Sequence, residues 1–138
     1  QDSGRQPQSI QVYLVAVGDD GKTGKKIGCG DSLLPVTRTI KKTAAPFTAA
    51  IRELLLTPQH PEGTPNLENF WKGRNLRVRS AAIVNHTATI RLSGEVFVAG
   101  ICDEPRITSQ IEATARQFPN VKKVKVFIGK QTLADAIR

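Results

Sequence analysis

The amino-acid sequence predicts an α+β fold: one mixed, largely antiparallel sheet of four to five strands, with two helices packed on one of its faces. Several segments alternate apolar and polar residues with the period of two that is typical of strands. Two further segments repeat apolar residues with helical spacing. Each of those two segments has a single apolar face, so both helices should pack on the same side of the sheet.

The chain of 138 residues has the length of one domain. We predict a disordered lead-in over residues 1–8, which are mostly polar, and a single domain over residues 9–138. No stretch approaches the ~20 consecutive apolar residues of a transmembrane helix. Hydrophobic residues make up 39% of the chain, an ordinary share for a globular protein, so disorder of the whole chain is not expected.

Five segments have the composition and alternation of strands. The second of them contains Pro35, which cannot donate to a strand ladder, so that strand should lie at an edge or pair only in part. Asn85 and His86 occupy the turn of a predicted hairpin, where Asn tolerates the left-handed backbone that tight hairpins need. The strands are expected at residues 9–17, 33–41, 76–84, 87–93 and 121–128.

Helices are predicted over residues 46–56 and 104–117. Pro46 and Pro105 suit the first turn of each helix, and Asp103 can cap the second. Between the first helix and the hairpin runs a long connection, residues 57–75, whose single Trp71 is interpreted as a cap on the core. Residues 130–138 add a short terminal helix or fray. The apolar stripes are Phe47, Ala50, Ile51, Leu54 and Leu55 in the first helix, and Ile107, Ile111, Ala115 and Phe118 in the second.

The residues with catalytic potential are scattered. Nucleophilic catalysis needs a Ser or Cys near a base, yet His60 lies in a Pro-rich loop and His86 in a predicted turn. The glycine-rich segment 28–31 lacks the Lys-Ser/Thr ending of a phosphate-binding loop. We therefore expect a protein that is not an enzyme and that needs no cofactor.

The two cysteines, Cys29 and Cys102, do not form a CxxC pair, and neither histidine has a ligand-like spacing to them. The sequence therefore predicts no metal site. A disulfide between the two is one interpretation, and it would require an oxidising compartment. Two reduced thiols are the other.

Charge gives the main indication of a partner. Twenty Lys and Arg residues against twelve Asp and Glu residues give a formal net charge of +8, which favours anionic partners. Strand alternation should place five cations on the sheet face that the helices leave bare, and two aromatic rings have the same parity. The cations are Arg77, Arg79, Arg91, Lys123 and Lys125, and the rings belong to Tyr13 and Phe127.

Such a face has two interpretations. Cations for phosphates and rings for bases are what a single-stranded nucleic-acid binder needs. However, any antiparallel sheet covered on one side turns its polar residues to water. No RNP-like segment or Gly-x-x-Gly loop supports RNA binding, so nucleic acid is the alternative hypothesis.

An ordered set of segments from residue 9 to about residue 135 resembles the GerMN domain, named for a spore-germination protein and found in many bacterial surface lipoproteins. The strand Thr-Ala-Thr-Ile-Arg-Leu-Ser at 87–93 and the Pro-Val-Thr-Arg segment at 35–38 carry most of the likeness. The other matching segments are residues 10–15, 28–34, 49–55, 76–80 and 107–111.

The resemblance implies a fold similar to the ring-building motifs of secretion and sporulation complexes. It also implies a non-enzymatic, extracytoplasmic domain at the cell surface or envelope, contacting an envelope protein or an anionic wall polymer. Export would favour a bridge between Cys29 and Cys102. Membrane contact is expected only through an anchor upstream of Gln1. The five cations, with Tyr13 and Phe127, are the expected contact residues for either kind of partner.

Overall fold

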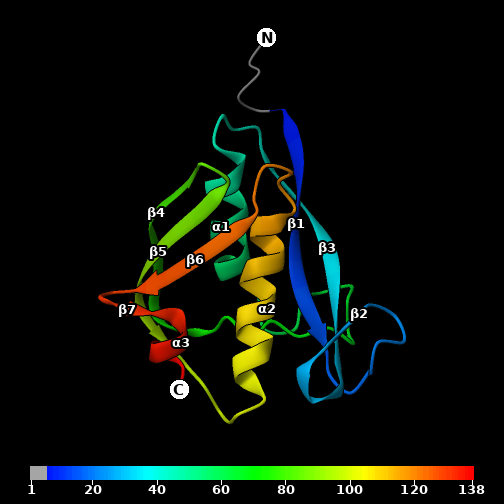
Figure 1. Cartoon of the computed structure of the whole chain (residues 1–138). Coiled ribbons are helices and arrows are strands. Elements are labelled where there is room, and N and C mark those ends of the chain that lie inside the picture. Colours follow the sequence, from blue (N-terminus) through cyan, green and yellow to red (C-terminus); the bar gives the residue numbers. More distant parts are fainter. Residues whose placement is uncertain (1–5) are drawn as a thin grey trace.

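A computed structural model describes residues 6–138 (Figure 1) and confirms the α+β class. The first strand begins at Pro7, two residues earlier than expected, so the end of the predicted lead-in is part of the sheet; residues 1–5 lie outside the described residues. The elements are β1 (Pro7–Ala16), β2 (Lys25–Ile27), β3 (Asp31–Lys41), α1 (Pro46–Leu56), β4 (Gly73–Val84), β5 (Thr87–Val96), α2 (Asp103–Arg116), β6 (Lys123–Ile128), β7 (Gln131–Thr132) and α3 (Leu133–Ala136), with a 3-10 turn at Gly28–Gly30.

The strands form two sheets, which corrects the prediction of a single one. Sheet A has the order β1-β3-β2 and is antiparallel. Sheet B has the order β4-β5-β6-β7, in which β5 and β6 run parallel and the other pairs antiparallel. The helices α1 and α2 lie between the sheets: α1 contacts β4 and β1, and α2 contacts β1 and β6 (Figure 1). Both helices thus cover one face of sheet B, as expected, while sheet A covers their other side.

The two sheets stay separate because side chains of α2, and of Gln117 directly after it, occupy the second edge of β1. The N–H of Gln11 donates to Gln117 Oε1 at 2.9 Å, and its carbonyl accepts from Gln117 Nε2 at 2.7 Å. The N–H of Tyr13 donates to Thr114 Oγ1 at 3.2 Å, and its carbonyl accepts from Gln110 Nε2 at 2.8 Å. These backbone groups are therefore paired without a neighbouring strand.

Val15 continues this pattern at the end of β1. Its N–H donates to the carbonyl of Glu68 at 2.9 Å, and its carbonyl accepts from the N–H of Glu68 at 2.8 Å. Glu68 belongs to the long connection between α1 and β4, so this connection closes the last part of the edge. Every second residue of β1 from Gln11 to Val15 thus has partners outside sheet A.

Pro35 stands where a proline costs no strand hydrogen bond. The N–H groups of Gln11 and Tyr13 point away from β3. Thr37 and Pro35 lie opposite them in the antiparallel register, so the backbone nitrogens of these two residues point away from β1. On that side β2 pairs only with Asp31–Leu33, so the edge of β3 is open at Pro35. The expectation of an edge or partly paired strand is confirmed.

The hairpin turn and the core agree with the sequence. Asn85 and His86 have φ of 50° and 66°, the left-handed values of a two-residue hairpin turn. Trp71 is buried, and its Nε1–H donates to the carbonyl of Ile107 at 2.8 Å. Apolar side chains from both sheets and from all three helices form one continuous core cluster.

Buried Asn69 holds the connection between α1 and β4 in place. Its Nδ2 donates to the carbonyls of Leu54 and Thr57 at 2.9 and 2.8 Å. Its Oδ1 accepts from the N–H of Trp71 at 3.0 Å and from Gln110 Nε2 at 2.9 Å. The connection is thus an internal part of the fold, and buried hydrogen bonds join it to α1 and α2.

Candidate functional site

The face of β4, β5 and β6 that turns away from the helices is called here the outer face of sheet B. Inward residues such as Ile90 and Val126 are buried, and their neighbours along each strand are exposed or half-buried. The strand register sets Ser80 beside Arg91 and Phe127, Ala82 beside Thr89 and Lys125, and Val84 beside Thr87 and Lys123, with Arg77 opposite Ser93. The structure therefore brings Arg77, Arg91, Lys123, Lys125 and Phe127 to one face.

Arg79 also lies on this face, at an irregularity in the pairing of β4 with β5. The register between β4 and β5 shifts between Val78 and Ser80, because Val78 lies opposite Leu92 and Ser80 opposite Arg91. Arg79 is therefore the extra residue of a β-bulge, and both Arg79 and Ser80 are exposed. Strict alternation alone would have placed Arg79 here and Ser80 inside. The bulge keeps both out of the core.

The cations of the outer face lie on three adjacent strands and have no acidic partners among residues 6–138. Neighbouring strands lie about 4.8 Å apart, and every second residue along a strand about 6.6 Å. The Arg91 guanidinium lies 4.7 Å from the centre of the Phe127 ring, a cation–π contact that holds both side chains against the sheet. Among residues 6–138, none of the five cations pairs with a carboxylate within 4.0 Å. Their charge is directed to solvent.

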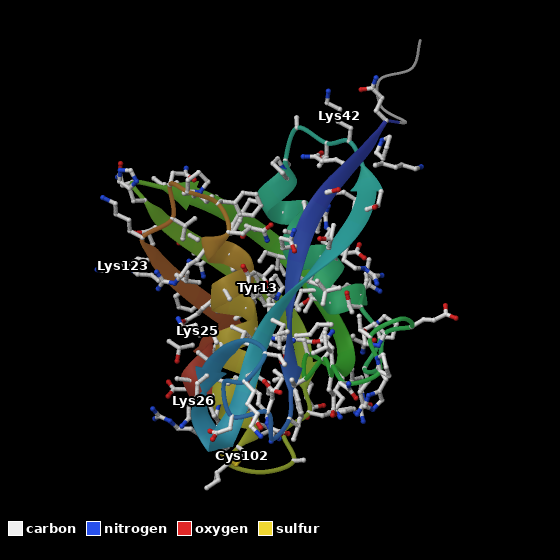
Figure 2. All side chains as sticks on the ribbon, turned by 90° about the vertical axis from the view of Figure 1, so that its right-hand side faces the viewer. Tyr13, Lys25, Lys26, Lys42, Cys102 and Lys123 are labelled. Atoms are coloured by element: carbon white, nitrogen blue, oxygen red, sulfur yellow. A yellow bond between two sulfur atoms is a disulfide. The ribbon has the colours of Figure 1, made fainter. Side chains whose placement is uncertain are left out.

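Tyr13 does not belong to the outer face, contrary to the prediction. It lies on β1 in sheet A, on the other side of the helices, where it is half-buried against the core. Figure 2 shows Tyr13 at the middle of β1 and Lys123 on the separate sheet behind it. Alternation had assigned the side of a strand correctly but could not reveal that β1 belongs to another sheet. The outer face therefore has one ring, that of Phe127.

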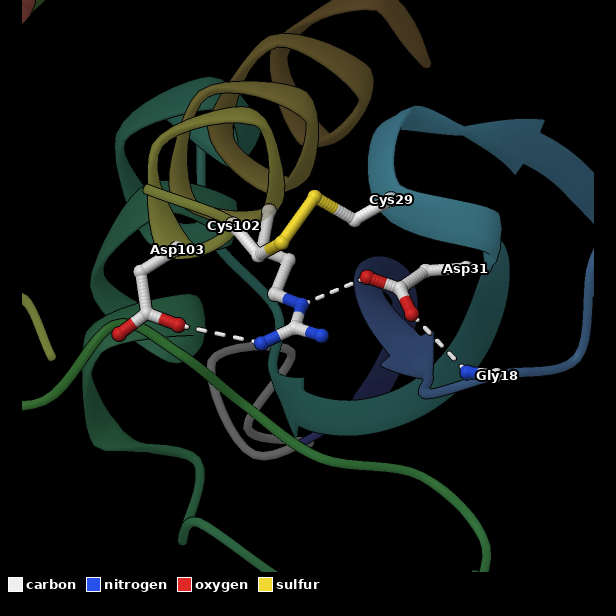
Figure 3. Close-up of a disulfide and its surroundings, with 6 residues drawn as sticks. Gly18, Cys29, Asp31, Cys102 and Asp103 are labelled. Atoms are coloured by element: carbon white, nitrogen blue, oxygen red, sulfur yellow. Dashed lines mark hydrogen bonds and ion pairs between the residues drawn. A yellow bond between two sulfur atoms is a disulfide. The ribbon is translucent and has the colours of Figure 1, made fainter. Parts of the chain in front are cut away.

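A second polar cluster, named here the clasp, lies at the start of α2 (Figure 3). Its centre is Arg106, whose Nε donates to Asp31 Oδ2 at 2.6 Å and whose Nη1 donates to Asp103 Oδ1 at 3.2 Å. The Arg106 side chain is 16% exposed and that of Asp31 only 1%. The hydrogen bond from Arg106 to Asp31 raises the pKa of the guanidinium above its usual value. This pairing satisfies the charges in the cluster and is structural in character.

The disulfide between Cys29 and Cys102 lies beside these side chains, with the two Cα atoms 5.8 Å apart (Figure 3). It joins the turn before β3 to the residue preceding α2. Asp103 does not cap α2 as expected, because it is the first residue of the helix and its Oδ2 accepts from the N–H of Ala99 at 2.8 Å. The clasp and the disulfide together attach sheet A to α2.

The residues with catalytic potential have other contacts. His86 Nδ1 lies 3.0 Å from the carbonyl oxygen of Asn120. The carboxylate of Asp19 accepts hydrogen bonds from the N–H of Thr23, the Thr23 hydroxyl and the Ser32 hydroxyl, and these bonds lower its pKa, that from the Thr23 N–H most. His60 lines an open groove of about 590 Å³. In residues 6–138 no three His, Cys, Asp or Glu side chains are placed to hold a metal ion.

A family model described as "Germane: Sporulation and spore germination" matches residues 11–134. The chain belongs to the Germane family. No curated protein sequence matches the chain significantly.

Solved GerMN domains share the fold of this Germane chain. The tandem GerMN domains of the sporulation protein GerM from Bacillus subtilis align with a TM-score of 0.64 at 22% identity, covering 91% of this chain and 40% of that one. The first GerMN domain of the same protein aligns at 0.61 with 21% identity, covering 91% and 86%. A structure described as a putative lipoprotein from Clostridium perfringens aligns at 0.52 with 17% identity, covering 91% and 76%. The chain thus spans less than half of the tandem structure.

Sequence reasoning about this Germane domain missed two features. The clasp escaped because Asp31 and Arg106 are 75 residues apart, and nothing local pairs them. The loop over residues 97–101, Phe-Val-Ala-Gly-Ile, is a run of apolar residues between a strand and a helix, and this run was a signal that was available. No helix in residues 6–138 is long and apolar enough to span a bilayer.

Proposed function

We propose that this Germane domain works outside the cytoplasm as a non-enzymatic binding or assembly domain. Its outer face of sheet B contacts an anionic partner, either an envelope protein or an anionic cell-wall-associated polymer. The family description in terms of sporulation and germination, and a fold shared with a putative lipoprotein, support an envelope setting. The outer face supplies the contact.

One observation carries this proposal. Five cations stand on one solvent-facing surface of three strands, and no carboxylate within residues 6–138 neutralises any of them. Unpaired cations held on a rigid sheet attract a polyanion without having to break internal ion pairs first. Regular strand spacing also suits a ligand with repeating negative groups.

The test is retention of the protein on immobilised polyglycerol-phosphate polymer at ~0.1 M salt. Replacing Arg91, Lys123 and Lys125 by Ser should weaken retention about tenfold or more, because three charges near the polymer are lost. A control variant with Ser in place of Lys22, Lys41 and Lys42, which are exposed outside sheet B, has the same net charge. Equal losses in the two variants would show that net charge alone is responsible and would reject the outer face.

Single-stranded nucleic acid is the second candidate, favoured by the ring of Phe127 next to Arg91. The location of Tyr13 in sheet A weakens it, since stacking of successive bases requires more than one ring. Oligonucleotide titration at two salt concentrations separates charge from stacking. Under the main proposal, Phe127→Ala leaves oligonucleotide affinity within about twofold; a loss of ~1–3 kcal/mol, the size of one stacked base, would favour nucleic acid instead.

A further inference from the structure

The loop between β5 and α2 presents a concentrated apolar surface, named here the apolar tip (residues 97–101). Phe97, Val98 and Ile101 are 45%, 37% and 82% exposed. In residues 6–138, the other large apolar side chains that are similarly exposed, Val17, Leu56 and Val84, lie singly on separate elements. Figure 1 shows the loop projecting at the lower end of the molecule, beyond the end of α2. A projecting cluster of this kind indicates contact with another apolar phase.

Part of the polar backbone of the tip is already paired within the protein. The N–H of Phe97 donates to the carbonyl of Lys72 at 2.9 Å, and that of Ala99 to Asp103 Oδ2 at 2.8 Å. The carbonyls of Gly100 and Ile101 accept from the first N–H groups of α2. A loop enters a water-poor layer at low cost only when such groups are satisfied internally, so these four bonds lower the cost in part and favour a shallow position in the interfacial layer.

The tip is also held rigidly. Cys102, which follows it directly, is bridged to Cys29, and Asp103, which binds its backbone, is fixed by Arg106. Figure 2 shows Cys102 at the same end of the molecule as Lys26. Because the loop does not need to be ordered when it binds, little conformational entropy is lost on contact.

The cations around the tip form ion pairs with neighbouring carboxylates. The Arg74 guanidinium lies 5.9 Å from the Phe97 ring, and Arg138 lines the same groove as Phe97, Val98 and Ile101. Glu95 pairs with Arg74 at 3.9 Å and Asp135 pairs with Arg138 at 3.6 Å, while the carboxylate of Glu104 also lies nearby. The tip itself carries no charge, and the whole chain has a net charge of +8. Attraction to an anionic surface therefore comes from the net charge of the whole chain and not from the charges beside the tip.

We propose that the apolar tip inserts into the interfacial layer of an anionic lipid bilayer, so that the domain binds a membrane peripherally. Three exposed apolar side chains form a small area for a protein interface, which needs a larger surface of complementary shape. A fluid acyl layer needs no such complementarity, and a protein with a net positive charge is drawn to an anionic bilayer, where its apolar side chains can insert. This contact is separate from the outer face of sheet B and adds a membrane to its partners.

Co-sedimentation of the full chain with phosphatidylglycerol/phosphatidylcholine vesicles tests the proposal. Ile101→Ser should lower the partition coefficient about tenfold, since one buried Ile side chain is lost from the lipid. The matched control is Leu56→Ser, because Leu56 is 74% exposed at the end of α1, and its partition should equal that of the unchanged protein. Failure of the unchanged protein to sediment, or equal sedimentation of the two variants, overturns the proposal.

Insertion depth gives a second readout. A Trp introduced as Ile101→Trp should be quenched by brominated acyl chains, and one introduced as Leu56→Trp should not, while buried Trp71 contributes a constant background. The variant with Ser at positions 91, 123 and 125 should keep the quenching of the Ile101→Trp reporter at saturating lipid. Quenching that disappears in that variant would assign vesicle binding to the outer face. Failure of polymer retention with quenching intact would remove the proposed function alone.

Discussion

Arg106 joins three parts of the fold through one side chain. Its guanidinium pairs with Asp31 at the start of β3 and with Asp103 at the start of α2, and it lies 4.7 Å from the centre of the Phe70 ring in the connection before β4. The remaining oxygen of Asp31 accepts from the N–H of Gly18 at 2.9 Å. Removing one partner of a buried carboxylate leaves its charge uncompensated, which lowers the stability of the folded protein.

Replacing Arg106 by Met should therefore be costly, although the shape of the side chain is largely kept. Asp31, which is 1% exposed, would lose its cation, and breaking a buried ion pair on one side costs about 3–5 kcal/mol. Urea denaturation at neutral pH measures the loss. Arg52→Met on the exposed side of α1 is the control and should change stability by less than ~0.5 kcal/mol. A loss that small for Arg106→Met would mean that water replaces the guanidinium.

Asp19 makes stability depend on acid. Hydrogen bonds to its carboxylate lower its pKa in the folded protein, so its stabilising contribution is complete above the unfolded pKa of about 3.9 and is lost as pH falls through the lower folded pKa. Asp19→Asn should be less stable than the unchanged protein at neutral pH, and the difference should shrink at ~pH 3. Urea midpoints at both pH values test this, with exposed Glu62→Gln as the control. A difference independent of pH would contradict it.

At the scale of elements, α2 serves as a neighbour for β1. Its inward side carries polar residues at positions 110 and 114 among apolar ones, and Gln117 follows directly after the helix. These three residues pair with the edge of β1 that no other strand covers. Gln110 also accepts from the N–H of Phe70 at 2.9 Å, so it connects β1, α2 and the connection after α1. Packing of sheet A on the helices is therefore specified by hydrogen bonds as well as by apolar contact.

The disulfide adds a covalent link between the same elements. Replacing both Cys29 and Cys102 by Ser should lower the free energy of unfolding by about 4 kcal/mol, because the bridge spans 73 residues and restricts the unfolded chain. Thermal or urea unfolding measures the loss. Dithiothreitol should reproduce it in the unchanged protein and leave the double variant as it was. A loss below ~1 kcal/mol in the free energy of unfolding would indicate that the bridge restricts the unfolded chain little, and that the clasp is the main link between these elements.

The elements themselves were largely predictable. Period-two and helical patterns located both long helices and the five longer strands, and Asn85-His86 located the hairpin turn. Two short strands were missed: β2 has three residues in a Gly-rich segment, and β7 has two residues after a tight turn. Such strands are too short to show a period. Local pattern therefore identifies elements only where they are long enough to repeat.

On the scale of the whole molecule, the division into two sheets decided which predictions succeeded. The five cations come together because alternation within β4, β5 and β6 is a local property and those strands are neighbours. Tyr13 has suitable alternation but lies in sheet A. Sheet membership depends on contacts more than 100 residues apart, such as that between Gln11 and Gln117, and a single sequence does not display them. The candidate site was thus predictable within a sheet and not between sheets.

The whole molecule also separates its proposed contacts in space. The outer face of sheet B covers one side, and the apolar tip projects from the end of the molecule below α2 (Figure 1). A domain bound to lipid through its tip would leave the cations of the outer face accessible. The two proposed partners could therefore be engaged at the same time.

The edge of β1 has a use beyond this protein. Glutamine and threonine at intervals of four and three interrupt the apolar pattern on the buried side of a helix and its last turn. Here they take the place of a neighbouring strand, because their amide and hydroxyl groups form hydrogen bonds with the backbone of β1. In another sequence, the same spacing of polar residues would indicate a helix that covers the last strand of a sheet, and so would help to predict how many sheets the fold contains.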